Sequence, residues 1–296
     1  PHELPRLIMQ ARELNKLRGT FLHGLLNHNN QGRIHAHINQ IRSDSGGTVT
    51  GRFSYNHPNL QQIPSRGQFA QDIRKLFIPE QGEYWLKADY SQQEPRLLTH
   101  FAKLVEQPGS TEVQEAYQKT DLDFHQQTAD MAGVERKLAK TIGLGVMYGM
   151  GYHKLARELD MEPQEAKLML QDFHSKVPFM KGMLEAVMNR ANNKGVIRTL
   201  LGRKCRFDLW EPTSWGVHKA LPLNQAQTEY GMAIKRAHTY KALNRLIQGS
   251  AADQTKKAMV EVYEQLGIVP LIQVHDELDC SVKDEKQANQ IKEIME

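Results

Sequence analysis

The run Gln273–Glu277 reads QVHDE and places two adjacent acids between apolar stretches. Residues 268–274 lead into the acids and residues 278–282 lead out. Both stretches are β-prone, so we expect a hairpin with Asp276 and Glu277 at its tip. Carboxylates beside an apolar strand are costly unless something pairs with them, and a divalent cation would do so. The alternative is an ordinary turn, in which Asp is common.

Another acid, Asp89, follows a predicted buried strand over residues 84–88 and precedes a predicted helix over residues 97–104. The carboxyl end of a strand is a common place for ligand chemistry, although an acid there would also complement the dipole of a following helix. If the two strands are neighbours, Asp89 and Asp276 converge. Two carboxylates with open positions suit Mg²⁺. Two such ions roughly 3.5–4 Å apart can activate an attacking oxygen and stabilise a leaving one.

A second set of residues recurs at every fourth position: Arg136, Lys140, Leu144 and Tyr148. In a helix this spacing makes one slowly drifting stripe. Two cations could bind a triphosphate at one end, and the aromatic ring could border a flat base at the other. Phosphoryl transfer depends on positioning and charge neutralisation, which this stripe could supply. The alternative is an ordinary exposed basic face with Tyr148 in the core.

The elements that would position these residues follow from apolar spacing and from prolines and glycines. Between residues 28 and 67 the chain is turn-rich and carries Arg52 and Arg66, whose planar guanidinium groups suit phosphate, although a loop arginine is often only a soluble residue. The remaining predicted elements are helices over residues 4–26, 121–132 (carrying His125), 158–193 (broken near Pro163 and Pro178), 223–247 and 250–266, with Gln248-Gly249 between the last two, and a hairpin over residues 195–209.

Composition sets broad limits on the class of protein. The chain has 296 residues, enough for one large domain or two to three subdomains, and its net charge of +4 is a weak indication of a polyanionic partner. The two distant cysteines match no zinc-finger spacing and fit a reducing compartment. No apolar run approaches about 18 residues, so we expect no membrane span. Both ends stop inside helical patterns, so we expect a piece of a longer protein.

Taken together, these runs resemble the motifs of family A DNA polymerases, the DNA polymerase I-like enzymes, and especially their phage members. Asp89–Arg96 (DYSQQEPR) is similar to the first palm motif, Arg136–Gly149 to the fingers helix, and Val274–Glu277 (VHDE) to the second palm motif. The runs Thr50–Arg52, Asn59–Arg66 and Asn244–Gly249 also match. The resemblance covers nearly the whole chain, and the order and spacing of the motifs make it specific.

The resemblance implies an α+β, right-hand fold with an antiparallel palm sheet, inserted and largely helical fingers, and a partial thumb. Its implied boundaries are a thumb tail over residues 1–27, palm over residues 28–98 and 232–296, and fingers over residues 99–231. The palm would be truncated at its C-terminal end.

The same resemblance implies a role for each site residue. The catalytic residues would be Asp89, Asp276, Glu277 (more helper than ligand) and Lys140 (a general acid to the pyrophosphate). The nucleotide-binding residues would be Arg136, Lys140, Leu144, Tyr148, Glu94 (the steric gate against a 2′-hydroxyl), His125 and Gln92. The DNA-binding residues would be Arg52, Arg66, Asn244, Gln248 and His275. Two Mg²⁺ ions, for which Mn²⁺ could substitute, would be held by Asp89, Asp276 and the backbone carbonyl of Tyr90.

The implied activity is template-directed addition of deoxynucleotides to a primer 3′-hydroxyl, with release of pyrophosphate. The implied partners are primer–template DNA and deoxynucleoside triphosphates. We expect a monomer without a membrane partner in the cytoplasm of a bacterial or phage-infected cell, and a processivity partner is left open. The chain departs from the family at Leu144, where Phe or Tyr is usual, and at Gly143, where Asn is frequent. A leucine cannot stack as an aromatic ring does.

Three other functions remain open at this point. A single-subunit RNA polymerase shares the two aspartates, but Glu94 and the run Gln61–Pro64 argue against it. A non-catalytic nucleic-acid-binding protein would not need both Asp89 and Asp276. A metal-dependent nuclease would use the same acids but would not need the four-residue stripe.

Overall fold

We describe the protein from a computed structural model, which covers residues 3–43, 46–65, 67, 69–119, 122–214 and 216–296. The chain divides into two compact units. Unit 1 contains Pro1–Tyr90 and Thr255–Glu296, and unit 2 contains Ser91–Gln254. Each unit has a hydrophobic core of its own.

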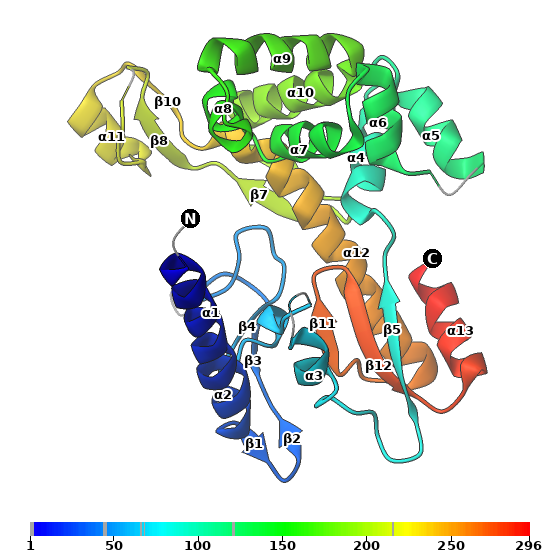
Figure 1. The fold of residues 1–296 in the computed structure, drawn as a ribbon. Helices are drawn as coiled ribbons and strands as arrows, with labels where there is room; N and C mark the ends of the chain where they lie inside the picture. The colour runs from blue at the N-terminus through cyan, green and yellow to red at the C-terminus, as the bar shows by residue number, and fades with distance from the viewer. Residues whose placement is uncertain (1–2, 44–45, 66, 68, 120–121, 215) are drawn as a thin grey trace. The chain divides into compact units, whose positions relative to one another are not determined.

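Unit 1 is organised around a three-stranded antiparallel sheet in the order β11-β12-β5 (Figure 1). The strands are β5 (Tyr84–Asp89), β11 (Ile272–Val274) and β12 (Glu277–Val282). The predicted final hairpin therefore exists, and it pairs with the strand that ends at Asp89, as expected. Two details of the prediction are wrong. Glu277 is the first residue of β12 rather than part of the tip, and β5 is partly exposed because it lies at an edge of the sheet.

The two faces of this sheet differ because side chains alternate along a strand. Leu278, Cys280 and Val282 are buried on one face and pack in a cluster with residues of α12 (Ala242–Leu266) and α13 (Glu285–Met295). The other face of the ladder carries the charged residues, since Asp89 lies opposite Glu277 and Lys87 lies opposite Asp279. The amphipathic pattern of these strands thus leaves one polar face.

The rest of unit 1 is a helical segment followed by short elements. The predicted helix over residues 4–26 is confirmed, and one part of it, Leu17–His23, is π-helical. Phe21 and Leu25 are buried, whereas α1 has no buried residue. The bounds are α1 (Leu4–Lys16), η1 (Leu17–His23), α2 (Gly24–Leu26), β1 (Asn29–Asn30), β2 (Arg33–Ile34), β3 (His37–Asn39), β4 (Ser54–Asn56), η2 (Leu60–Gln62) and α3 (Ala70–Arg74).

Unit 2 is mainly helical, and its core contains Phe124, Ile142, Phe173 and Phe179. Prolines begin α9 and α10, as predicted, because a proline at the first helical position lacks only an N–H that would have no partner there. The helix bounds are α4 (Gln93–Leu104), α5 (Ser110–Lys119), α6 (Phe124–Ala132), α7 (Arg136–Met147), α8 (Tyr152–Leu159), α9 (Pro163–Lys176) and α10 (Pro178–Lys194).

The predicted hairpin over residues 195–209 is also present, as β6 (Val196–Arg198) paired with β7 (Lys204–Arg206). A small antiparallel sheet follows in the order β10-β8-β9. Its bounds are β8 (Leu209–Pro212), β9 (Leu221–Pro222) and β10 (Ile234–Arg236), with α11 (Leu223–Tyr230) and the 3-10 helix η3 (Thr239–Lys241) nearby in sequence.

The predicted helices over residues 223–247 and 250–266 are wrong in two respects. Gly231, at φ 74°, follows the end of α11, and β10 pairs with β8 instead of continuing the helix. Conversely, Gln248-Gly249 does not interrupt α12, which runs unbroken for 25 residues. A helix-interior glycine costs about 1 kcal/mol, and the burial of neighbours such as Ile247 and Ala251 outweighs that cost.

No helix within the described ranges is long and apolar enough to cross a membrane.

Candidate active site

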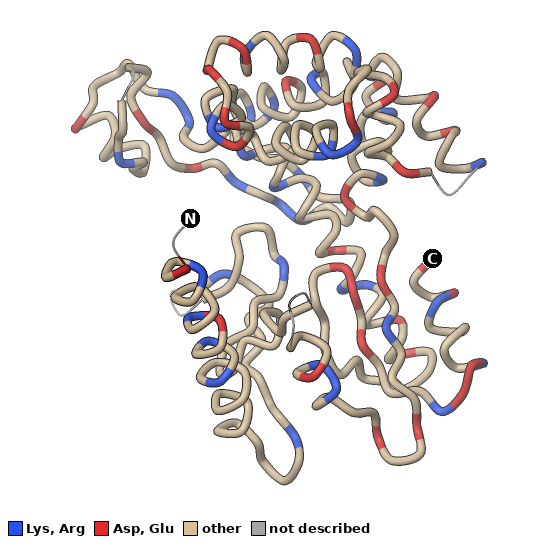
Figure 2. Tube along the Cα trace, viewed as in Figure 1, with Lys and Arg blue, Asp and Glu red and all other residues tan. Residues whose placement is uncertain are grey.

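The structure brings together the carboxylates of Asp89, Asp276 and Glu277 at one end of the β5–β12 ladder in unit 1. Glu277 lies directly opposite Asp89 in the antiparallel ladder, which directs their side chains to the same face. Asp276 occupies the two-residue loop that precedes β12, and its carbonyl oxygen accepts a hydrogen bond of 3.3 Å from the amide of Tyr90. Figure 2 shows acidic residues at the end of β5 and at the turn between β11 and β12.

Burial is the largest cause of the raised pKa values of Asp89 and Asp276, and neighbouring acids add to the effect. Burial, followed by the charges of Asp276 and Glu277, raises the pKa of Asp89 to about 6, while the charge of Lys87 acts in the opposite direction. Burial also raises the pKa of Asp276, and the charge of Arg52 opposes this shift. A bound cation would favour the charged carboxylates and so offset both the burial and the repulsion behind these shifts. The donor set at this site therefore fits a divalent metal ion.

Glu277 is oriented by a lysine on the neighbouring strand. Its Oε2 lies 2.7 Å from Nζ of Lys87. Among the described residues no group of three or more His, Cys, Asp or Glu side chains could hold a metal ion, so Glu277 does not complete a three-carboxylate site with Asp89 and Asp276. The candidate side-chain ligands here are the two carboxylates of Asp89 and Asp276, with backbone carbonyls close by. Sequence reasoning missed Lys87. Strand alternation could have found it, because Lys87 lies two residues before Asp89 and therefore on the same face.

A cavity of about 380 Å³ borders the ion pair between Lys87 and Glu277. Its lining includes Trp85, Lys87, Glu277 and Asp279. Asp279 is only 6% exposed, and burial, followed by the charge of Glu277, raises its pKa to about 6. The charged face of the sheet is therefore partly enclosed.

In unit 2, α7 presents the predicted stripe on one side. Arg136, Lys140 and Tyr148 are exposed and Leu144 is half-buried, whereas Ile142 on the opposite side is fully buried. The alternative that places Tyr148 in the core is therefore wrong. Its hydroxyl donates a 3.1 Å hydrogen bond to Oε2 of Glu94, in the first turn of α4.

Glycines in and just after α7 allow other parts of the chain to approach its backbone closely. A Cβ on Gly145 would lie 1.9 Å from Cε of Met150, and Gly149, at φ 72°, would place one 2.5 Å from the carbonyl oxygen of Tyr240. Gly143 is different, since a Cβ there would meet only Cε of Met180, at 3.7 Å. Packing thus accounts for Gly149, whose neighbour is a backbone atom, whereas the end of the flexible Met150 side chain could move away from a residue at position 145.

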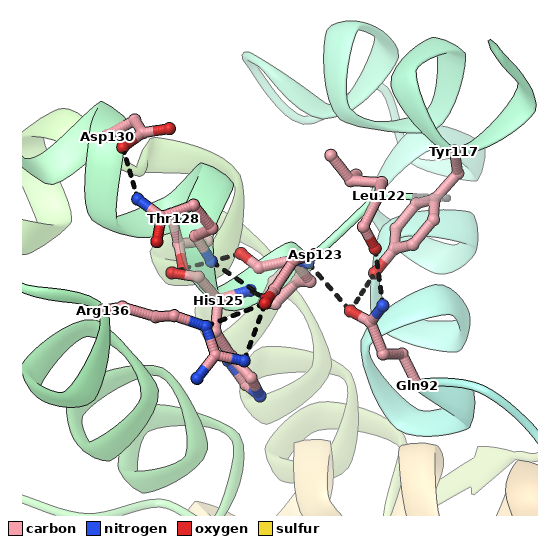
Figure 3. Close-up of polar contacts among 10 residues, drawn as sticks. Gln92, Tyr117, Leu122, Asp123, His125, Thr128, Asp130 and Arg136 are labelled. Atoms are coloured by element: carbon pink, nitrogen blue, oxygen red, sulfur yellow. Dashed lines mark hydrogen bonds and ion pairs between the residues drawn. The ribbon is translucent and has the colours of Figure 1, made fainter. Parts of the chain in front are cut away.

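A cluster of polar contacts joins the start of α7 to the start of α6 (Figure 3). Asp123 accepts hydrogen bonds from Nε and Nη2 of Arg136 at 2.8 and 2.7 Å. His125 is buried, and burial, followed by the charge of Lys140, lowers its pKa. The side-chain amide of Gln92 bonds to the backbone of residues 122 and 124. Gln92 therefore fixes the segment that carries Asp123 and His125.

Comparison with known proteins assigns the chain to a family. The family model described as DNA polymerase family A matches residues 1–296. The chain belongs to DNA polymerase family A.

Similar proteins come from both phages and bacteria. A DNA-directed DNA polymerase of Pseudomonas phage M6 is 37% identical over 343 residues, which cover 99% of this chain and 48% of the relative. The thermostable DNA polymerase I of Thermus aquaticus is 34% identical over 312 residues, which cover all of this chain and 34% of the relative. The chain thus spans half the length of these relatives or less.

A solved structure of the family agrees with the fold. It is the POL domain of Pol1 from M. smegmatis in complex with DNA primer-template and dNTP, with a TM-score of 0.78 and 29% identity. The match covers 99% of this chain and 49% of that chain. The α+β fold of a family A polymerase domain, expected from the sequence, is thereby confirmed.

The residues expected to contact DNA lie in both units. In unit 1, Arg52 is half-buried, and its charge acts on Asp276. His275 is exposed in the loop before β12 at φ 59°. In unit 2, Asn244 and Gln248 are half-buried and four residues apart on α12, so they share one helix face. Arg66 lies outside the described residues.

Proposed function

We propose that the protein is a template-directed DNA polymerase that adds deoxynucleotides to a primer 3′-hydroxyl and releases pyrophosphate. The observation that carries the proposal is the proximity of Asp89 and Asp276, whose charges interact at one end of the β5–β12 ladder, in a chain that belongs to polymerase family A. Because the chain spans at most half of its relatives, the activity, substrate and partners are all part of this proposal.

Asp89, Asp276 and the carbonyl of Tyr90 would hold two Mg²⁺ ions, for which Mn²⁺ would substitute. When bound, the ions would lower the pKa of the primer hydroxyl and neutralise charge on the phosphates. The protein's own contribution is a rigid placement of the carboxylates, since both belong to one antiparallel ladder and its turn. Glu277, paired with Lys87, would support that arrangement without acting as a ligand.

The exposed cations of α7 would bind the triphosphate. Arg136 and Lys140 lie one helical turn apart, which matches the extent of adjacent phosphate groups. Lys140 carries protons that it can donate to the departing pyrophosphate, and this makes it the candidate general acid. His125 lies close enough to feel the charges of both, so the three residues would share one anionic group.

Glu94, Tyr148 and Leu144 would select the nucleoside. The Glu94 carboxylate is held by the Tyr148 hydroxyl, and a fixed side chain there would exclude a ribose 2′-hydroxyl. Leu144 lies one turn before Tyr148 and would offer the base an aliphatic surface in place of a ring. Glu94 would thus select the sugar by shape. Leu144 would contact the base more weakly than an aromatic residue would.

Arg52, Arg66, Asn244, Gln248 and His275 would contact the primer–template. Minor-groove acceptors are shared by all correct base pairs, so hydrogen bonds to them test pair geometry and not sequence. Residues 1–27 would be a thumb tail, residues 28–98 and 232–296 palm, and residues 99–231 fingers. The enzyme would act as a monomer in phage or bacterial DNA replication.

A primer-extension assay tests the proposal. With a primed template and Mg²⁺, the protein should extend the primer with dNTPs, stop when the metal is chelated, and resume with added Mg²⁺ or Mn²⁺. Parallel reactions with rNTPs should be much slower. Extension with rNTPs at the same rate would instead favour an RNA polymerase, and degradation of the primer without extension would favour a nuclease.

A further inference from the structure

Asp123 divides its two carboxylate oxygens between two tasks. We propose that Asp123 is a positioning residue that holds one edge of the Arg136 guanidinium, so that the opposite edge is presented to the triphosphate of an incoming nucleotide. The inference rests on the proposed function, because it assumes that Arg136 binds phosphate. It assigns the role to a residue that makes no contact with the substrate itself.

One oxygen of Asp123 fixes the carboxylate in place. Its Oδ1 accepts hydrogen bonds from the backbone amides of His125 (2.9 Å) and Gln126 (3.1 Å), which caps the N-terminus of α6. An N-cap acid satisfies amides that have no partner within the helix and also complements the helix dipole. The side chain is therefore held by the backbone whether or not Arg136 is present.

The other oxygen holds the arginine. Oδ2 lies 2.8 Å from Nε and 2.7 Å from Nη2 of Arg136. These two nitrogens form one edge of the planar guanidinium, while Nη1 and the second hydrogen of Nη2 form another. Asp123 thus binds the Nε–Nη2 edge of the guanidinium, and the Nη1–Nη2 edge faces away from Asp123. The spacing of Nη1 and Nη2 matches that of two phosphate oxygens.

The segment that carries Asp123 is held by Gln92, the N-cap residue of α4. Oε1 of Gln92 accepts a 2.8 Å hydrogen bond from the amide of Phe124, and its Nε2 donates to the carbonyl of Leu122. Tyr117 adds a 3.4 Å contact to the same Oε1 (Figure 3). Both neighbours of Asp123 in the chain are therefore anchored, and the position of its carboxylate is defined from two sides.

The charge balance favours the same role. Burial acts to raise the pKa of Asp123, but the hydrogen bonds from Arg136 and from backbone amides outweigh it, and the pKa is lowered. Asp123 therefore remains an anion at neutral pH. It offsets one of the positive charges around His125, which include Arg136 and Lys140. Without Asp123, the flexible Arg136 side chain would sample many orientations. Nucleotide binding would then have to fix one of them, at a cost in conformational entropy.

Two variants separate the cap from the ion pair. Asp123→Asn keeps an oxygen for the amides of α6 but then turns its NH₂ group toward the guanidinium, which cannot accept it. Asp123→Ser is also a good N-cap and is too short to reach Arg136. The control is Asp284→Asn. Asp284 caps α13 through Gln287, and no described contact joins it to an arginine.

The test is equilibrium binding of inorganic tripolyphosphate and of a dNTP by calorimetry, in wild-type and Arg136→Ala backgrounds. We expect both Asp123 variants to weaken both ligands by about three- to five-fold, because exposed ion pairs contribute modestly. Asp284→Asn should leave both affinities unchanged. The Asp123→Asn effect should vanish when Arg136 is already Ala, and primer extension should show a raised nucleotide KM with little change in kcat.

Other results overturn the inference. Unchanged or tighter binding in both variants would show that Asp123 is a spectator or a competitor. An equal loss in the Arg136→Ala background would show that the effect passes through the helix cap. The proposed function fails separately. If tripolyphosphate binding behaves as expected but the wild type never extends a primer, only the polymerase proposal is lost. If extension is normal and Asp123→Asn has no effect, only the inference is lost.

Discussion

The hydroxyl of Tyr148 lies 3.1 Å from Oε2 of Glu94 and links the end of α7 to the first turn of α4. Glu94 is half-buried, so its carboxylate has limited room to move. The hydrogen bond from Tyr148 restricts it further. A carboxylate held in this way can discriminate by shape, because accommodating an extra hydroxyl would require the hydrogen bond to break.

Glu94→Ala should therefore reduce the preference for dNTPs over rNTPs by at least about tenfold. The measurement is the ratio of kcat/KM for matched dNTP and rNTP incorporation. Glu94→Gln preserves the shape of the side chain and should change the ratio much less. Tyr148→Phe removes only the hydrogen bond and should give an intermediate effect. An unchanged ratio in Glu94→Ala would rule out this residue as the gate.

Lys87→Met should tighten binding of divalent cations by about two- to five-fold. Lys87 is the positive charge that opposes the raised pKa of Asp89, and Met keeps most of its volume. Removing it makes the acid cluster more negative. Titration with Mn²⁺ measures the change directly. Lys257→Met is the matched control, since Lys257 forms a 2.6 Å ion pair with Glu261 on α12. Weaker metal binding in Lys87→Met would contradict the expected sign.

Leu144→Phe should lower the nucleotide KM. The residue is half-buried and packs against the core of unit 2, so one side of its side chain is already supported. A ring there could stack on a base, and such contacts contribute about 1–3 kcal/mol. Leu144→Met keeps the volume without the ring and should leave KM nearly unchanged. An unaltered KM for Leu144→Phe in steady-state extension would count against base contact at this position.

Gly143, inside α7, and Gly149, just after its end, should respond in opposite ways to alanine. Gly143→Ala should stabilise the protein by about 0.5–1 kcal/mol, because it lies inside the helix and a Cβ meets only Met180 at 3.7 Å. Gly149→Ala should destabilise it by at least about 1–2 kcal/mol, because φ is 72° and the carbonyl of Tyr240 lies 2.5 Å from the new atom. Chemical denaturation monitored by circular dichroism measures both. The same sign for the two variants would contradict this packing.

Much of the fold follows from local signals in the sequence. Prolines at positions 163 and 178 mark helix starts, and the β-prone stretches around Asp276 predict the hairpin. Convergence of Asp89 and Asp276 depends on the two strands being neighbours, and the structure meets that condition because β12 pairs with β5. The four-residue recurrence on α7 predicted a solvent-facing stripe, and the structure has one.

The remaining features depend on tertiary contacts that no local pattern contains. Gly249 suggested a break, but burial along α12 outweighs the cost of one glycine. β10 is only three residues long and forms because β8 pairs with it. The contact between Asp123 and Arg136 spans two helices, so neither residue's neighbours in sequence indicate it.

The most direct test of the account is the extension rate of Asp89→Asn and Asp276→Asn, measured with duplex binding in the same samples. Each variant should lose at least about a thousand-fold in rate while binding primed DNA as tightly as the wild type, because the carboxylates hold metal ions and not DNA. Asp284→Asn should behave as the wild type. Extension within about tenfold of the wild-type rate in either variant would contradict the claim that these two acids form the catalytic centre.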